Sequence, residues 1–205
     1  MSKKRNVREF LLRTGMKEEA VHSSCEQLCS FYKQELYCRA SAKIGGYIGP
    51  GNRSASIMVI SDRPNETESK TKVVGFEDYA TILTVMLGRK GINFRDVYWT
   101  LAVKEDTDTI TMDMIQRHKA ALRKEIFSVA PTLIITLGSA PITSILGERI
   151  HIKKPTIKYT FDINPHLEDV PILALPHPRT ALFEDTETFR QYYRNAWKSL
   201  NKLID

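Results

Sequence analysis

The feature of this sequence that most constrains its fold is a short apolar run with abrupt polar boundaries. Residues 55–60 are rich in β-branched side chains, and turn-forming residues flank them on both sides. Such a run is typical of a strand that is buried in a parallel sheet. Immediately after it, the chain becomes polar at Ser61-Asp62-Arg63-Pro64. Because the ligands of open α/β sheets bind beyond the carboxyl ends of the strands, this turn is the expected place for a functional site.

Runs of the same kind recur along the chain and alternate with amphipathic helical patterns. We expect strands over residues 55–60, 96–103, 132–137 and 170–175. We expect helices over residues 79–91, 112–130, 139–146 and 184–203. The alternation predicts an α/β protein, with a three-layer α/β/α fold around a four-stranded, mostly parallel central sheet. Residues 66–72 are expected to form a polar, mobile segment, and residues 148–170 are expected to be irregular.

The N-terminal residues 1–40 have a helical pattern, and we expect them to belong to a single domain that spans residues 1–205. Cys25 and Cys29 are four residues apart, so they share one face of the expected helix. They are either two metal ligands or two small core residues, and we favour the core interpretation. With Cys38 the cysteines are odd in number, which argues against a disulfide framework.

The charge balance favours a polyanionic partner. The formal net charge is +6 and the sequence pI is near 9.2, although a diffuse, solvated Lys/Arg surface has the same composition. The glycine-rich residues 45–52 lack a Gly-Lys-Ser/Thr ending, which argues against a nucleoside-triphosphate site. No apolar run after the basic start suits a signal peptide or a membrane span. We therefore expect a monomer without a membrane partner, in the cytoplasm (nucleoid) or nucleus and not secreted.

Three polar residues stand at the carboxyl ends of the expected strands: Asp62, Lys104 and His177. Because the carboxyl ends of parallel strands meet at one edge of a sheet, these side chains are expected to converge. Each also has a purely structural interpretation. Asp62, two residues before Pro64, is equally typical of a turn or cap, and His177 between two prolines is typical of a rigid surface turn.

Four motifs in order resemble the uracil-DNA glycosylase superfamily, and its thermostable iron–sulfur class most of all. Residues 49–55 read Gly-Pro-Gly-Asn-Arg-Ser-Ala, and the turn Ser-Asp-Arg-Pro-Asn after the strand is similar to the family's Gly-Glu-Ala-Pro-Gly. Residues 97–104 resemble Val-Tyr-Ile-Thr-Asn-x-x-Lys, and residues 131–138 resemble Pro-x-x-(apolar)₃-Leu-Gly. Residues 177–182, His-Pro-Arg-Thr-Ala-Leu, resemble His-Pro-Ser-x-x-Leu.

The resemblance implies a monofunctional DNA glycosylase that acts on a flipped uracil or related damaged base, without metal or cofactor. Asp62 and His177 are then the catalytic residues. Asp62 would stabilise the oxocarbenium-like sugar or orient the attacking water. His177 would donate a hydrogen bond to the anionic oxygen of the departing base.

The resemblance also implies contacts with the substrate and with the DNA backbone. The expected substrate-binding residues are Ser61, Arg63, Pro64, Val73, Phe76 and Leu101. The expected DNA-binding residues are Lys104, Ser139, Arg179 and Leu182. Leu182 is either a wedge that fills the space of the flipped base or a core residue.

The sequence departs from the family at several of these positions. The asparagine that reads uracil falls on Leu101, which has no donor or acceptor, and the stacking phenylalanine falls on Val73, with Phe76 as its possible substitute. Two of the cluster cysteines correspond to Glu105 and His118. An iron–sulfur cluster needs four soft ligands, so we expect none here.

Leu101 keeps more than one function open, because a site loses selectivity when its hydrogen-bonding partner becomes apolar. Leu101 leaves three alternatives: backbone groups read the base, another base is the substrate, or catalysis has been lost. The second hypothesis is therefore a catalytically inactive DNA-binding protein of the same fold, with replication or repair proteins as partners. A third is an unrelated α/β enzyme that acts on free nucleosides.

Overall fold

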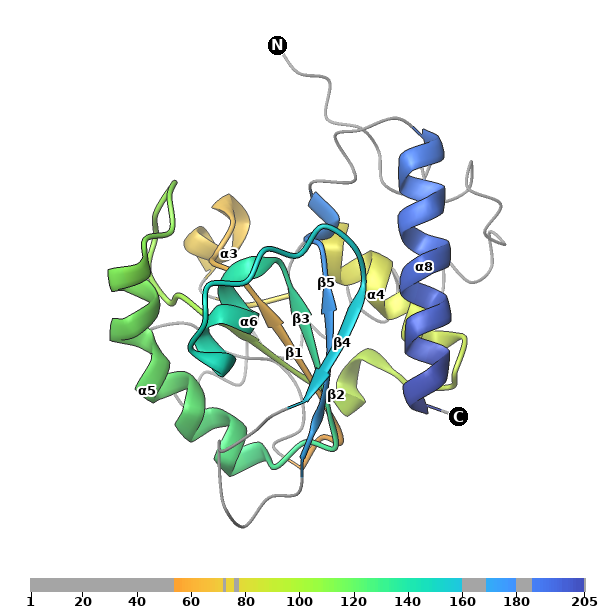
Figure 1. The fold of residues 1–205 in the computed structure, drawn as a ribbon, viewed down its shortest axis with the longest axis horizontal. Coiled ribbons are helices and arrows are strands. Elements are labelled where there is room, and N and C mark those ends of the chain that lie inside the picture. Colours follow the sequence, from red (N-terminus) through yellow and green to blue (C-terminus); the bar gives the residue numbers. More distant parts are fainter. Residues whose placement is uncertain (1–53, 72, 76–77, 160–168, 180–185, 205) are drawn as a thin grey trace.

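The structure is a computed structural model that describes residues 54–71, 73–75, 78–159, 169–179 and 186–204. Its centre is a five-stranded sheet with the strand order β2-β1-β3-β5-β4 (Figure 1). The strands are β1 (Ile57–Ser61), β2 (Val97–Leu101), β3 (Leu133–Leu137), β4 (Thr156–Tyr159) and β5 (Pro171–Leu175). All neighbouring strands are parallel except β4, which is antiparallel to β5. The α/β class and the predicted strands are thus confirmed, and β4 is an additional strand within a segment expected to be irregular.

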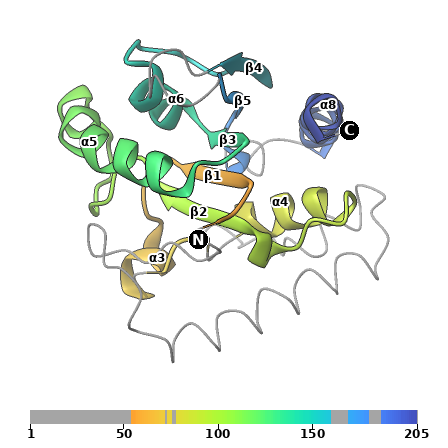
Figure 2. The same ribbon diagram turned by 90° about the horizontal axis from the view of Figure 1, so that it is seen from below.

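Helices cover both faces of the sheet. They are α3 (Glu66–Thr71), α4 (Asp78–Gly88), α5 (Met112–Val129), α6 (Ser139–Leu146) and α8 (Thr186–Ile204), with a short 3₁₀ helix η1 (Phe94–Asp96). Figure 2 shows α5 and α6 on one side of the sheet and α4 on the other. Helix α8 contributes to the same core cluster as α4. The predicted three-layer α/β/α arrangement is confirmed.

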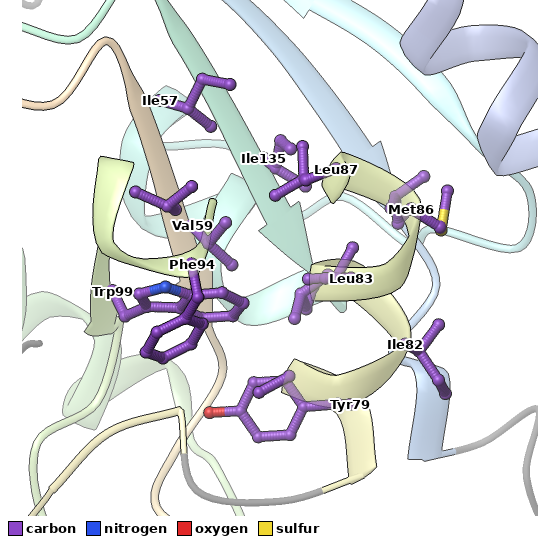
Figure 3. Packing of buried hydrophobic residues seen from close by; sticks show 14 of the residues in the cluster. Ile57, Val59, Tyr79, Ile82, Leu83, Met86, Leu87, Phe94, Trp99 and Ile135 are labelled. Atoms are coloured by element: carbon purple, nitrogen blue, oxygen red, sulfur yellow. The ribbon is translucent and has the colours of Figure 1, made fainter. Parts of the chain in front are cut away.

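The continuous apolar character of the strands follows from this double coverage. Alternate residues of β1 belong to different core clusters: Ile57 and Val59 pack with α4 (Figure 3), and Met58 and Ile60 pack with α5 and α6. A strand that is buried on both faces has no polar side and cannot show the alternation of a half-exposed strand. Every residue of β1, β2 and β3 is buried accordingly.

Local signals account for the ends of the long helix α5. The Thr111 hydroxyl accepts a hydrogen bond from the Met114 N–H, so it caps the first turn. Ala130 adopts the left-handed conformation (φ 48°) at the C-terminus, and Pro131 after it cannot continue a helix.

Helix α3 lies where a polar, mobile segment was expected from the sequence. Asn65 and Glu68 form a reciprocal capping box: the Asn65 side chain accepts from the Glu68 N–H (2.8 Å), and the Glu68 carboxylate accepts from the Asn65 N–H (3.0 Å). The spacing Asn-x-x-Glu is the sequence signature of this motif. The predictions for residues 1–40, the three cysteines included, lie outside the described residues. No helix among those described is both long and apolar enough to span a membrane.

Candidate active site

Three adjacent strands, β1, β3 and β5, end at the same edge of the sheet, and a polar or glycine residue lies within two residues of each end. Asp62 follows β1, Gly138 follows β3, and Pro176 and His177 follow β5. The Asp62 Oδ1 atom lies 3.6 Å from His177 Nε2. The convergence that was predicted for Asp62 and His177 is therefore present.

His177 is a buried, neutral hydrogen-bond donor. Its Nδ1 accepts a hydrogen bond from the Arg179 N–H (3.1 Å), so the proton of the neutral ring is on Nε2. Nε2 lies 3.1 Å from the Ser61 hydroxyl. Burial lowers the pKa of His177 to about 4; the Asp62 carboxylate opposes this shift, and the cations Arg179 and Arg63 reinforce it. At neutral pH the ring therefore presents an uncharged N–H.

The same geometry argues against Ser61 as a nucleophile. A serine nucleophile needs a histidine nitrogen that is free to accept its proton. Here Nδ1 is occupied by a backbone N–H, and Nε2, the nitrogen beside Ser61, carries the ring proton. Ser61 is almost fully buried and acts as an acceptor for the imidazole.

Asp62 is more accessible, with 23% of its side chain exposed. Its Oδ1 accepts from the Arg63 N–H (2.7 Å), which fixes the rotation of the carboxylate, and the Ser61 hydroxyl lies 3.5 Å from the same oxygen. No hydrogen bond joins Oδ2 to any residue that the structure describes. Oδ2 is thus available to a water molecule or a substrate.

Gly138 lies beside both catalytic candidates. Its φ of 94° and ψ of −176° lie in a region that is essentially restricted to glycine. A Cβ atom at this position would lie 3.7 Å from the Cβ of His177 and 3.9 Å from Oδ2 of Asp62. Its N–H donates to the carbonyl of Leu175 at 2.8 Å. A Cβ atom here would therefore pack against both the acid and the imidazole, and the glycine leaves that space unfilled.

Gly138→Ala is expected to destabilise the fold by roughly 1–3 kcal/mol, because alanine is strained in this conformation. Chemical denaturation with urea measures the change. The matched control is Gly88→Ala at the end of α4, where an added Cβ meets nothing within 4 Å and alanine is the better helix former. Equal stability of the two variants would contradict the conformational requirement at Gly138.

Asp62 and His177 line one hollow of about 940 Å³, within the roughly 300–1,000 Å³ of small-molecule sites. Its other walls come from the start of α6, the 152–155 segment and α8. Ser139, which was expected to bind DNA, lies on this wall, and its hydroxyl accepts from the Ile152 N–H (3.1 Å).

Lys153 and Lys154 form an exposed basic rim of the hollow. Neither lysine was predicted as a site residue, because no family motif covers their segment. The cluster of Arg149, Lys153, Lys154 and Lys158 in the sequence was the available signal. Two lysines at the mouth of a hollow suit a phosphate backbone.

Lys104 does not join this site, and the prediction that it contacts DNA is wrong. Only 5% of it is exposed. Its ammonium lies 2.8 Å from the Glu125 carboxylate and donates to the Thr100 hydroxyl (2.7 Å) and the Leu101 carbonyl (2.8 Å). Burial lowers the pKa of Lys104, and the neighbouring Glu125 carboxylate opposes that shift. An ammonium that is enclosed in this way cannot reach a phosphate.

Two expected substrate contacts are core residues instead. Leu101 is fully buried and packs with the α4 cluster, opposite Ser61 in the sheet register, and Val73 is buried in the same cluster. Neither residue lines the hollow. Phe76 and Leu182 lie outside the described residues.

The remaining expected site residues surround Asp62 and His177. Pro64 is buried, and Arg63 is half-buried beside Asp62. Arg179 is half-buried too, and its N–H fixes the His177 tautomer. Both arginines therefore act on the site through its electrostatics.

The two positions that match cluster cysteines are neighbours in space. Glu105 Oε1 lies 3.4 Å from His118 Nε2 and 3.1 Å from the Arg117 guanidinium. Within the described part of the chain, no group of three or more His, Cys, Asp or Glu residues is placed to hold a metal ion.

The sequence matches a known protein family over the region that contains this site. The family model described as the uracil DNA glycosylase superfamily matches residues 48–201, which is more than half of the chain. The matched region runs from before β1 into α8 and includes Asp62, Gly138 and His177. This match supports a DNA glycosylase-like function in general, with DNA as the substrate. The chain belongs to the uracil DNA glycosylase superfamily.

Proposed function

We propose that this protein is a monofunctional DNA glycosylase that hydrolyses the N-glycosidic bond of a flipped uracil or related damaged base. The supporting observation is the 3.6 Å separation of Asp62 Oδ1 and His177 Nε2 at the wall of one hollow. The two residues differ in exposure and in charge at neutral pH. That difference suits them to opposite ends of the bond that breaks.

His177 is suited to the departing base. The base must leave the stack before its glycosidic bond is accessible, and it then gains negative charge as the bond breaks. The Nε2–H of the neutral imidazole transfers its hydrogen bond from the Ser61 hydroxyl to the charged base oxygen. A preorganised donor in a buried site needs little rearrangement and is strongest where charge develops.

Asp62 is suited to the sugar. Its Oδ2 accepts a hydrogen bond from the attacking water, and the carboxylate stabilises the positive charge that develops on the sugar ring. The water oxygen bonds to the anomeric carbon while the base leaves with the electron pair of the broken bond. The proton of the water passes to the carboxylate or to solvent.

The basic rim is suited to the DNA backbone. Lys153 and Lys154 are exposed at the mouth of the hollow, and the Ser139 hydroxyl lies on its wall. Phosphate contacts of this kind hold the strand in register without reading its sequence. In this proposal the lysines take the role that the sequence analysis gave to Lys104.

A second candidate is a catalytically inactive DNA-binding protein of the same fold that acts in replication or repair. The burial of Leu101 favours it, because this side chain offers no hydrogen bond to a base edge. Sites that read a base through a hydrogen bond lose much of their selectivity without it. The basic rim serves both candidates equally.

The proposal is tested with oligonucleotides that contain one uracil, in single- and double-stranded form. The wild-type protein is expected to release uracil, and Asp62→Asn to release it roughly 100-fold more slowly. Asparagine keeps the size of Asp62 and an oxygen that accepts from the Arg63 N–H, but it loses the charge. DNA affinity, measured by fluorescence anisotropy, should stay unchanged.

The matched control is Asp113→Asn, the same exchange on the exposed surface of α5. It should leave the rate of base release at the wild-type value. If the wild-type protein binds DNA but releases no base from uracil or from any of a panel of damaged bases, the inactive DNA-binding protein is the correct reading.

A further inference from the structure

Glu68 is a fully buried carboxylate on α3 that the mechanism above does not use. One oxygen, Oε1, accepts from the Gly75 N–H (2.6 Å) and from the Tyr79 hydroxyl. The other, Oε2, accepts from the Asn65 N–H (3.0 Å). A buried carboxylate with donors at both oxygens holds every group that donates to it in place.

The three groups that donate to Glu68 belong to separate segments of the chain around the site. Asn65 follows directly after the turn that carries Asp62, and Tyr79 is on α4. Gly75 lies between them with a φ of 83°, and its N–H is also 3.1 Å from the Tyr79 hydroxyl. Glu68 thus ties the Asp62 turn and α4 to one point.

Tyr79 connects this point to the imidazole. Its ring is almost fully buried at the edge of the core, beside Trp99 (Figure 3). The ring centroids of Tyr79 and His177 are 5.4 Å apart, in an edge-on arrangement with an interplanar angle of 62°. The two nitrogens of His177 contact the Arg179 N–H and the Ser61 hydroxyl, and Tyr79 supplies a lateral contact.

We propose that Glu68 is a positioning residue of the active site, which orients the His177 ring through Tyr79 and the Asp62 turn through Asn65. Its effect on catalysis rests on the proposed glycosylase function, whereas its effect on the imidazole does not. Side chains that perform chemistry must be held close to their productive geometry by their supporting residues. Glu68 supplies this support to both catalytic candidates at once.

Glu68→Gln tests the proposal with almost no change of size. Glutamine has a single acceptor oxygen, so its NH₂ group must face either the Asn65 N–H or the donors of Gly75 and Tyr79. The misplaced imidazole is expected to lower kcat for base release by roughly 10- to 100-fold. The KM for DNA should change little, because Glu68 is fully buried and does not line the hollow.

The matched control is Glu66→Gln, the same exchange on the same helix. The Glu66 side chain is 81% exposed and pairs with Lys70 on the surface. Base release by this variant should equal that of the wild-type protein.

A measurement that is independent of activity separates this proposal from the proposed function. The ¹⁵N resonances of the His177 ring report its tautomer and hydrogen bonds in the free protein. They are expected to shift in Glu68→Gln and to stay at the wild-type position in Glu66→Gln. If they shift while the wild-type protein releases no base, the positioning role holds and the glycosylase assignment fails.

Tyr79→Phe is the second variant, and it decides the matter if Glu68→Gln does not fold. It keeps the ring beside His177 but removes the hydroxyl that donates to Glu68, so a smaller shift in the same resonances is expected. The proposal would be overturned if the His177 resonances kept their wild-type positions in whichever of Glu68→Gln and Tyr79→Phe folds.

Discussion

His177→Leu is expected to slow base release between roughly 100- and 1,000-fold, the effect of losing one preorganised donor to a developing anion. Leucine fills most of the space of the imidazole but has no N–H for the departing base. Single-turnover kinetics on a uracil-containing oligonucleotide measure the loss. The affinity for the same DNA should change little, because the contact forms mainly as the bond breaks.

The same variant is also expected to change how the free energy of unfolding depends on pH. In the folded protein the pKa of His177 is lowered to about 4, whereas an unfolded histidine has a pKa near 6.5. Between these pH values the unfolded chain binds a proton that the folded protein does not, so wild-type stability falls as the pH falls from about 6.5 to about 4. The pKa difference corresponds to about 3 kcal/mol.

His177→Leu removes this contribution, so its urea-unfolding free energy should fall less than that of the wild-type protein over the same pH range. His118→Leu is the control, because His118 is partly exposed on α5 beside Glu105. An unchanged pH dependence in His177→Leu would show that the imidazole is not held neutral by burial. An unchanged rate of base release would remove it from the mechanism.

The parts of the fold that were predictable are those with local causes. The four buried strands appear in the sequence as largely apolar runs, because both of their faces are covered. Once these strands are ordered in parallel, the turns after β1 and β5 must lie at one edge, which is why Asp62 and His177 were expected to converge. Their 3.6 Å separation depends on β3 alone lying between β1 and β5.

Strand β4 was missed because it is short and only two of its four residues, Ile157 and Tyr159, are apolar. It is a four-residue antiparallel edge strand, and Lys158 in it is exposed. Edge strands are often short and charged, which blunts their exposed hydrogen-bonding groups. Such a strand forms because β5 offers it a partner, and that partner lies more than ten residues further along the chain.

Lys104 was misassigned for a different reason. It was expected directly after a strand that ends at Val103, whereas β2 ends at Leu101, three residues before it. A strand end also does not determine whether a long side chain turns outward or inward. Lys104 turns back along β2 to the Thr100 hydroxyl and reaches Glu125 on α5. The sequence did contain a signal for this inward orientation. Glu125 is a carboxylate on the apolar face of an amphipathic helix, the face that also carries Leu122 and Ile126.

Lys104→Met is expected to destabilise the fold by roughly 3–5 kcal/mol, because it leaves the Glu125 carboxylate buried without its counter-charge. Both side chains of the pair are at most 3% exposed. The double variant Lys104→Met/Glu125→Leu should recover most of this loss, since replacing a whole buried ion pair with apolar groups is often close to neutral. Urea denaturation of the single and double variants measures the coupling between the two residues.

Lys70→Met is the matched control for this lysine, because its pair with Glu66 is exposed, at 72% and 81% for the two side chains. Exposed pairs of this kind contribute little to stability, so the variant should unfold at the wild-type urea concentration. The salt dependence of DNA binding is the measurement that could contradict the buried ion pair. If Lys104→Met keeps wild-type stability but weakens DNA binding and reduces its salt dependence, the ammonium contacts phosphate, and the buried ion pair is not what holds Lys104 in place.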